Sequence, residues 1–266
     1  MYRFTVVYFL FCLFLPLSAQ TTVSDQEAAR IRLVQANMPA VVTINVAYQD
    51  GSTFTGTGFV LTPEGLLATN RHVCENALYI NTTFPDGIVS DEAEVVATDN
   101  QVDLALLKIP AQNLHTVQIT PSAHALAGQD IVVIGNPRRL QNTVSTGIIS
   151  QVRQKADGTI WYQISAPLSP SSSGSPVFNM KGEVMAVAFA SLAGENNQNL
   201  NFAVPADYLR KLAESAGYQL PIDESHTPDK STSPTAANPF LNHIKRSWQI
   251  LCGFFKSAGP KDPDAK

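Results

Sequence analysis

The sequence predicts an all-β protein of two packed six-stranded antiparallel β-barrels, with short helices near its N- and C-terminal ends. Three observations support this prediction. Runs of β-forming residues are short, Gly, Pro, Asn and Asp interrupt them at regular spacing, and a looser connection at 110–128 divides twelve such runs into two sets of six. Many short strands at this spacing are typical of sandwiches and barrels rather than of βαβ sheets. Any cleft should therefore lie between the two barrels.

The two sets of strands predict one barrel at about 39–110 and another at about 128–204. In the first barrel we expect strands near 41–48, 54–61, 66–69, 78–84, 92–98 and 104–109. In the second we expect strands near 131–135, 143–153, 159–165, 176–179, 184–190 and 200–204. Ser24 followed by Glu27 is a capping-box signal for a short helix before the first barrel. The spacing of Leu209, Leu212 and Ala213 predicts another helix over 206–218.

Residues 1–20 have the pattern of a secretory signal peptide. Arg3 is the only charged residue, 4–17 are almost wholly apolar, and Ser18-Ala19-Gln20 provides a small-residue exit. The alternative is a membrane anchor, but a run of roughly 14 apolar residues is short for a span. We therefore expect an exported protein, periplasmic or extracellular.

Composition excludes several classes of function. A net charge of −4, with no basic run longer than a pair, gives no sign of a nucleic-acid partner. Beyond the signal peptide only Cys74 and Cys252 remain, too few for a disulfide-dense scaffold, and whether they pair is left open. No Cys/His spacing resembles a metal site, so we expect neither a metal nor a cofactor.

The C-terminal part changes character three times. Residues 218–238 are rich in Pro, Ser and Thr and predict a linker, 239–256 predict an amphipathic segment, and 257–266 a polar tail. On a helical wheel, the apolar face of 239–256 holds Phe240, Leu241, Ile244, Trp248, Leu251 and Phe255. Three partners for this face remain open: the chain's own barrel surface, another subunit, or a membrane surface.

The stretch from Ser169 to Pro176 predicts a tight turn that leads into a strand. It reads Ser-Pro-Ser-Ser-Ser-Gly-Ser-Pro and is followed by Val177-Phe178. Such a cluster can be a plain polar loop. However, a serine held on a rigid turn can also act as a nucleophile when a base is brought to it. Ser173 is the candidate.

His72 and Asp103 are the candidate partners of this serine. His72 follows an apolar strand, at a strand end where its side chain can face a cleft. Asp103 stands at the head of an apolar run, where a buried carboxylate would require pairing. The alternative is a strand end that leaves the carboxylate in water. One reason to keep a carboxylate there is to orient a histidine. The chain order His72, Asp103, Ser173 puts the first two on one barrel and the serine on the other, so the triad can form only across the interface.

At these residues the chain resembles the trypsin-like serine peptidases, most closely the HtrA/Deg-type branch of bacteria. The resemblance covers roughly residues 25–217, within a peptidase domain expected at 21–217. Five segments carry it: Gly56-Thr57-Gly58-Phe59-Val60, Thr69-Asn70-Arg71-His72-Val73, Asp103-Leu104-Ala105-Leu106-Leu107-Lys108, Ile134-Gly135-Asn136-Pro137 and Ser172-Ser173-Gly174-Ser175-Pro176.

The resemblance implies a chymotrypsin-like fold and a serine endopeptidase that acts on polypeptides. His72 would be general base and then general acid, Asp103 would orient it, and Ser173 would form an acyl-enzyme. The backbone N–H groups of Ser171 and Ser173 would form the oxyanion hole. The pocket for the residue before the scissile bond would have two walls, Ala166-Pro167-Leu168 and Val187-Ala188-Phe189. Because neither wall holds a carboxylate, the pocket would favour small or aliphatic residues.

Two departures from the family pattern bear on function. The family usually has Gly where this chain has Ser171, and a serine adopts the backbone angles open to glycine only reluctantly. A weakened oxyanion hole would leave a second hypothesis, a catalytically weak or inactive envelope protein that binds polypeptides or partners. HtrA-type proteins also usually carry a peptide-binding PDZ domain after the peptidase, and 218–266 are too short for one.

Overall fold

The computed structural model describes residues 24–120, 125–136, 142–189 and 200–220. All of them belong to the first of two compact units into which the chain divides, residues 1–223. The expected signal peptide, most of the linker, the amphipathic segment and the polar tail lie outside the described residues. Within the described ranges, no helix combines the length and the apolar character needed to cross a membrane.

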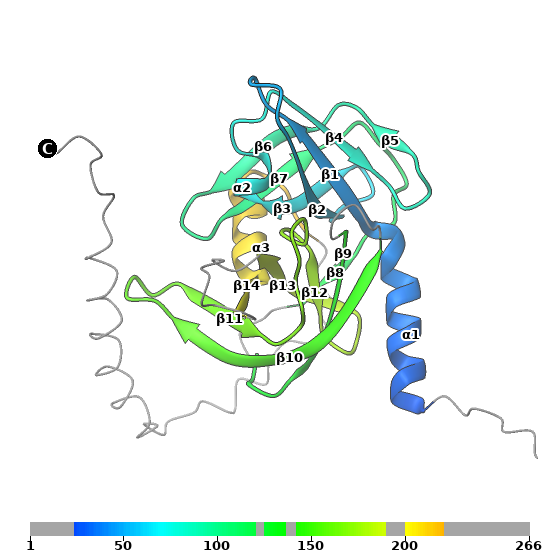
Figure 1. Cartoon of the computed structure of the whole chain (residues 1–266), viewed down its shortest axis with the longest axis vertical. Coiled ribbons are helices and arrows are strands. Elements are labelled where there is room, and N and C mark those ends of the chain that lie inside the picture. The colour runs from blue at the N-terminus through cyan, green and yellow to red at the C-terminus, as the bar shows by residue number, and fades with distance from the viewer. Residues whose placement is uncertain (1–23, 121–124, 137–141, 190–199, 221–266) are drawn as a thin grey trace, which may run out of the picture. The chain divides into compact units, whose positions relative to one another are not determined.

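The first half of the chain forms a seven-stranded antiparallel sheet in the order β5-β4-β1-β2-β3-β7-β6 (Figure 1). Its members are β1 (Val41–Ala47), β2 (Thr53–Val60), β3 (Leu66–Asn70), β4 (Tyr79–Thr83), β5 (Val89–Ser90), β6 (Glu94–Asp99) and β7 (Leu104–Lys108). No pairing between the edge strands β5 and β6 is found among the described residues, so this sheet is an open half-barrel rather than the closed barrel expected. One hydrogen bond, from Ala93 N to Ile80 O at 3.3 Å, bridges the gap beside β4.

The second half forms a closed six-stranded barrel. Its sheet runs β12-β9-β10-β11-β14-β13-β8, and an additional pairing of β12 with β13 closes the ring, while the short β8 lies parallel to β13 outside it. Its members are β8 (Gln118–Ile119), β9 (Asp130–Gly135), β10 (Thr143–Gln154), β11 (Ile160–Ile164), β12 (Pro176–Phe178), β13 (Glu183–Phe189) and β14 (Asn201–Pro205).

Helices are few and short. α1 (Asp25–Asn37) begins as the capping signal predicts, because the Ser24 hydroxyl accepts a hydrogen bond from Glu27 N at 3.2 Å. α3 (Ala206–Ser215) buries Leu209, Leu212 and Ala213. Two further helical turns are η1 (Met38–Ala40) and α2 (Arg71–Cys74). Figure 1 shows α1 beside the sheets and extending beyond them, which agrees with its mostly exposed surface.

The two sheets share one hydrophobic core. Phe59 of β2 and Phe178 of β12 are both fully buried and belong to the same cluster of packed side chains. A second cluster, which includes Ile131, Ile164 and Ala186, fills the barrel of the second half. Because β3 is buried along all five residues, it lies between other parts of the protein on both faces. The connection between β6 and β7 also contacts the second barrel, because Gln101 Nε2 donates to Thr159 Oγ1 just before β11 at 3.1 Å.

The all-β fold of the sequence prediction is confirmed, and each of the twelve expected strands has a counterpart within two residues at either end. The sequence did not predict β5 and β8, which span two residues each and are too short to give a pattern. It also placed His72 at a strand end, whereas the structure places it on the single turn of α2 that follows β3.

Candidate active site

The predicted nucleophile turn begins with a β-turn at Ser169–Ser172. Ser172 N donates to Ser169 O at 2.9 Å, Pro170 occupies the second position, and Ser171 has φ +74° in the third. Proline at the second position and positive φ at the third define a type II turn, which favours Gly or Asn where this chain has Ser171. A non-glycine residue in this region costs on the order of 1 kcal/mol. The surrounding structure must therefore hold Ser171 in place.

Ser173 follows this turn and is only 3% exposed. Its neighbour Gly174 has φ +87° and donates its N–H to Ala188 O at 2.9 Å, while Ala188 N donates to Ser175 O at 2.8 Å. A Cβ at Gly174 would lie 2.0 Å from Thr57 O and 2.4 Å from Thr69 Oγ1. Only glycine fits there, so the turn packs tightly against β2 and β3 of the first sheet.

Thr57 of β2 makes two hydrogen bonds to the carbonyl groups of this turn. Its backbone N–H donates to Ser173 O at 2.9 Å, and its Oγ1 donates to Ser171 O at 2.8 Å. The same Oγ1 accepts from Asn136 N at 3.0 Å, just after β9. Thr57 is fully buried. The contacts tie the candidate nucleophile segment of the second barrel to the sheet that carries His72.

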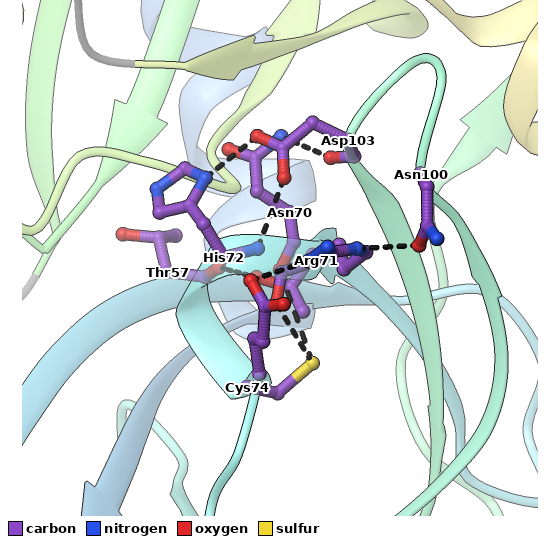
Figure 2. Close-up of polar contacts among 9 residues, drawn as sticks. Thr57, Asn70, Arg71, His72, Cys74, Asn100 and Asp103 are labelled. Atoms are coloured by element: carbon purple, nitrogen blue, oxygen red, sulfur yellow. Dashed lines mark hydrogen bonds and ion pairs between the residues drawn. The ribbon is translucent and has the colours of Figure 1, made fainter.

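His72 and Asp103 form a two-point contact. Asp103 Oδ2 lies 2.6 Å from His72 Nδ1, and Asp103 Oδ1 accepts from His72 N at 2.9 Å. Figure 2 shows the ring nitrogen bonded to Asp103 and the other ring nitrogen facing away from the carboxylate. This contact selects the tautomer in which Nδ1 carries the proton and Nε2 accepts one, as a general base requires.

Backbone contacts fix Asp103 itself. It has φ +58°, which aspartate tolerates better than most residues, and its carbonyl accepts from Arg71 N at 3.1 Å and Asn70 Nδ2 at 3.0 Å. The sequence left open whether this carboxylate is buried or lies in water at a strand end. The structure shows the second, because the side chains of His72 and Asp103 are 40% and 35% exposed. Water reaches the pair, and its two hydrogen bonds rather than burial define its geometry.

Arg71 and Cys74 flank His72 on α2. The Arg71 side chain donates to Asn100 Oδ1 at 2.5 Å and pairs with Glu75, which fixes the helical turn from outside (Figure 2). The Cys74 thiol is buried and donates to Arg71 O at 3.4 Å. Burial raises the pKa of the Cys74 thiol from 9.0 to about 11. Among the described residues Cys74 forms no disulfide, and Cys252 lies outside them.

The two predicted pocket walls lie in different surroundings. A cavity of about 390 Å³ borders the nucleophile turn, and Pro167, Leu168 and Ser172 line it together with residues of β9 and β10. Ala166, Val187 and Ala188 are buried in the cores, and Phe189 packs edge-on against Trp161 with ring centroids 5.1 Å apart. Among the described residues, none of 187–189 lines this cavity, so the structure does not bring the two predicted walls together around it.

No group of three or more His, Cys, Asp or Glu side chains within the described ranges could hold a metal ion. The expectation that the protein needs no metal or cofactor stays a prediction.

The sequence singled out Thr57 only as part of a motif and gave it no role. The signal that could have singled it out is a polar residue between two glycines, Gly56 and Gly58, on an otherwise apolar strand.

A closed six-stranded barrel packed on a half-barrel, with a histidine–aspartate pair on one and a serine turn on the other, defines the chymotrypsin-like peptidase class. Residues 56–187 match the family described as trypsin-like peptidase domain. The chain thus carries a trypsin-like peptidase domain, and its relatives are proteins of the HtrA, DegP and DegS type.

Curated relatives and solved structures agree on this branch. The chain is 38% identical over 168 residues to the serine protease HhoB of Synechocystis, with 60% of this chain and 40% of that protein covered. It is 34% identical over 169 residues to the serine endoprotease DegS of Haemophilus influenzae, with 59% and 49% covered. A protein of Chlamydia pneumoniae named as a DegP-like periplasmic serine endoprotease is 36% identical over 156 residues, with 57% and 32% covered.

The crystal structure of the serine endoprotease from Yersinia pestis aligns with a TM-score of 0.61 at 31% identity, covering 70% of this chain and 65% of that one. The HtrA-type protease AlgW, solved with a tripeptide, aligns with a TM-score of 0.64 at 28% identity, covering 70% and 62%. The chain spans less than half the length of the three curated relatives named above.

Proposed function

We propose that this protein is a serine endopeptidase of the HtrA/Deg type that hydrolyses peptide bonds in polypeptides. The observation that carries the proposal is the contact between Asp103 and His72 Nδ1 at 2.6 Å. It orients the imidazole as a base, on the same sheet against which the Ser173 turn packs. The names of the relatives and the tripeptide bound to the neighbouring AlgW support a polypeptide substrate.

In the proposed reaction, Ser173 attacks the scissile carbonyl while His72 Nε2 accepts its proton. His72 then gives that proton to the leaving amine, and the acyl-enzyme remains on Ser173. Asp103 stabilises the imidazolium formed in between. The N–H groups of Ser171 and Ser173 stabilise the oxyanion, which is the largest single electrostatic contribution in such sites. Water then attacks the acyl carbonyl while His72 Nε2 accepts its proton, and His72 returns that proton to Ser173 Oγ as the carboxylic acid product leaves.

The finer parts of the proposal concern specificity and location. Pro167 and Leu168, which line the cavity beside the nucleophile turn, contact the bound residue before the scissile bond, which is small or aliphatic. The protein acts outside the cytoplasm, after removal of residues 1–20. The name of the DegP-like relative, a periplasmic endoprotease, supports this location.

The test is labelling of purified protein with a fluorophosphonate probe, which reacts only with an activated serine. We expect the parent protein to label and Ser173→Ala to be silent, with kcat on peptide substrates lower by on the order of 10⁶. His72→Ala should cost a similar factor, non-additively, and Asp103→Asn about 10⁴ because it stabilises the wrong tautomer.

Ser172→Ala is the matched control, since Ser172 lies on the same turn and is also buried. If Ser172→Ala abolished labelling and Ser173→Ala retained it, the assigned nucleophile would be wrong. A parent protein that never labels would favour the second hypothesis, a polypeptide-binding protein without activity.

A further inference from the structure

The hydroxyl of Thr57 connects three segments of the protein. It donates to Ser171 O at 2.8 Å and accepts from Asn136 N at 3.0 Å, and Thr57 itself belongs to β2. Because Oγ1 accepts the Asn136 N–H, its own proton is directed to Ser171 O. The side chain is fully buried, so water cannot replace either bond.

The flanking glycines allow this position to be so crowded. A Cβ at Gly56 would lie 2.6 Å from Val73 Cγ1, and a Cβ at Gly58 would lie 2.6 Å from Ile44 Cδ1 and 3.0 Å from Ala68 O. Glycine on both sides therefore lets β2 lie close to α2 and β3. Thr57 is left as the one side chain of this triplet, and it faces the nucleophile turn.

The two hydrogen bonds from Thr57 to this turn hold the carbonyl groups of Ser171 and Ser173. The N–H groups of these same two residues are the proposed oxyanion donors. Fixing both carbonyl oxygens to one rigid strand therefore restrains the peptide planes next to each donor.

The turn geometry makes the restraint at Ser171 important. Type I and type II turns differ by rotation of their central peptide, and here that peptide is Pro170–Ser171, which carries the Ser171 N–H. Positive φ at Ser171 gives the type II arrangement, which a serine adopts at a cost. Relaxation to negative φ would turn the Ser171 N–H to the other side of the turn.

We propose that Thr57 is a positioning residue for the oxyanion hole, whose hydroxyl holds Ser171 at positive φ and so aims its N–H. The proposal rests on the peptidase function proposed above. Thr57 does not touch substrate. It acts through Ser171, as the restraint that lets a serine replace the glycine usual at that position.

The test compares Thr57→Val with the parent protein. Valine keeps the branched shape and lacks the hydroxyl. We expect kcat to fall about ten- to a hundredfold with KM nearly unchanged, because the oxyanion exists only in the transition state. The loss should stay below the 10² to 10³ of a removed donor, since the N–H remains and only its aim is lost. Affinity for a peptide boronate inhibitor should fall by a similar factor.

Thr82→Val is the matched control. Thr82 of β4 is also fully buried in the first sheet, but its Oγ1 has no hydrogen-bond partner among the described residues. We expect its kcat and boronate affinity to equal those of the parent. Thr57→Ser, which keeps the hydroxyl, should recover most of the kcat lost in Thr57→Val.

A second variant makes the coupling to Ser171 visible. Glycine adopts positive φ without strain, so Ser171→Gly should need the restraint less. Thr57→Val should therefore lower kcat several-fold less in a Ser171→Gly background than alone.

If Thr57→Val does not fold, Thr57→Cys replaces it. Its thiol is a weak hydrogen-bonding group. The kcat of Thr57→Cys should therefore be lower than that of Thr57→Ser.

The proposal is overturned if an active parent and a folded Thr57→Val, or Thr57→Cys in its place, show the same kcat and boronate affinity. It is also overturned if the two substitutions at 57 and 171 act independently. A parent that does not label with fluorophosphonate is a different result, because it refutes the peptidase function itself.

Discussion

Ser171 has a backbone conformation that glycine adopts at no steric cost. We expect Ser171→Gly to raise kcat or leave it unchanged, since the N–H donor is retained and its φ of +74° becomes unstrained. The free energy of unfolding should change by less than about 1 kcal/mol, because relief of strain is offset by the greater freedom of glycine in the unfolded chain. Steady-state kinetics and thermal unfolding measure both. A large fall in kcat would mean that the Ser171 hydroxyl has a role of its own.

The Cys74 thiol should make stability depend on alkaline pH. Burial raises its pKa to about 11 in the folded protein, above the ordinary value of 9.0. The folded state therefore holds its proton more tightly than the unfolded state. Its contribution is fully present below about pH 9 and is lost as the pH rises through 11. It amounts to on the order of 2 kcal/mol.

Denaturant unfolding of the parent and of Cys74→Ala at several values between pH 8 and 11 checks this. The unfolding free energy of the parent minus that of Cys74→Ala should fall as the pH rises, because only the parent loses the contribution of the buried thiol. Tyrosines, lysines and Cys252 titrate in both proteins and cancel. A difference that stays constant with pH would show that the thiol titrates alike in both states.

At the scale of elements, the sequence predicted the strands well and the contacts between them less well. Alternating and apolar runs located twelve strands, because a half-buried strand leaves a period in its own residues. The open edge of the first sheet left no such trace, because β5 and β6 follow one another in the chain yet lie at opposite edges, and whether they pair depends on how the whole sheet curves. Among site residues, His72 and Asp103 stood out by type and position, but the exposure of Asp103 and the contacts of Thr57 follow only from packing between barrels.

The specificity prediction rests on the segment before the nucleophile, of which Pro167 and Leu168 line the cavity beside the turn. Neither Ala166-Pro167-Leu168 nor Val187-Ala188-Phe189 contains a carboxylate. Desolvation of a Lys or Arg side chain there would not be offset by a buried countercharge. We therefore expect a peptide library to show cleavage after Val, Ala or Leu. A profile dominated by Arg or Lys would refute the assignment of these walls.

For the whole molecule, the described residues up to Leu220 form two hydrophobic cores. We therefore expect deletion of 239–266 to leave fluorophosphonate labelling and the unfolding temperature of the peptidase domain unchanged. Oligomer size by light scattering, or binding to anionic vesicles, should change if the amphipathic segment serves a subunit or a membrane. A deletion variant that fails to fold would make this segment part of the folded domain.

The division of the proposed triad between two sheets also determines when the triad can assemble during synthesis. A ribosome completes the residues of His72 and Asp103 first, and Ser173 follows 70 positions after Asp103 (173 − 103). Closure of the second barrel waits further, because β14 ends only at Pro205. A nascent or still unfolded chain therefore holds the base and the nucleophile apart. Under the proposed function, the chain therefore gains activity only after β14 has been made and the second barrel has closed.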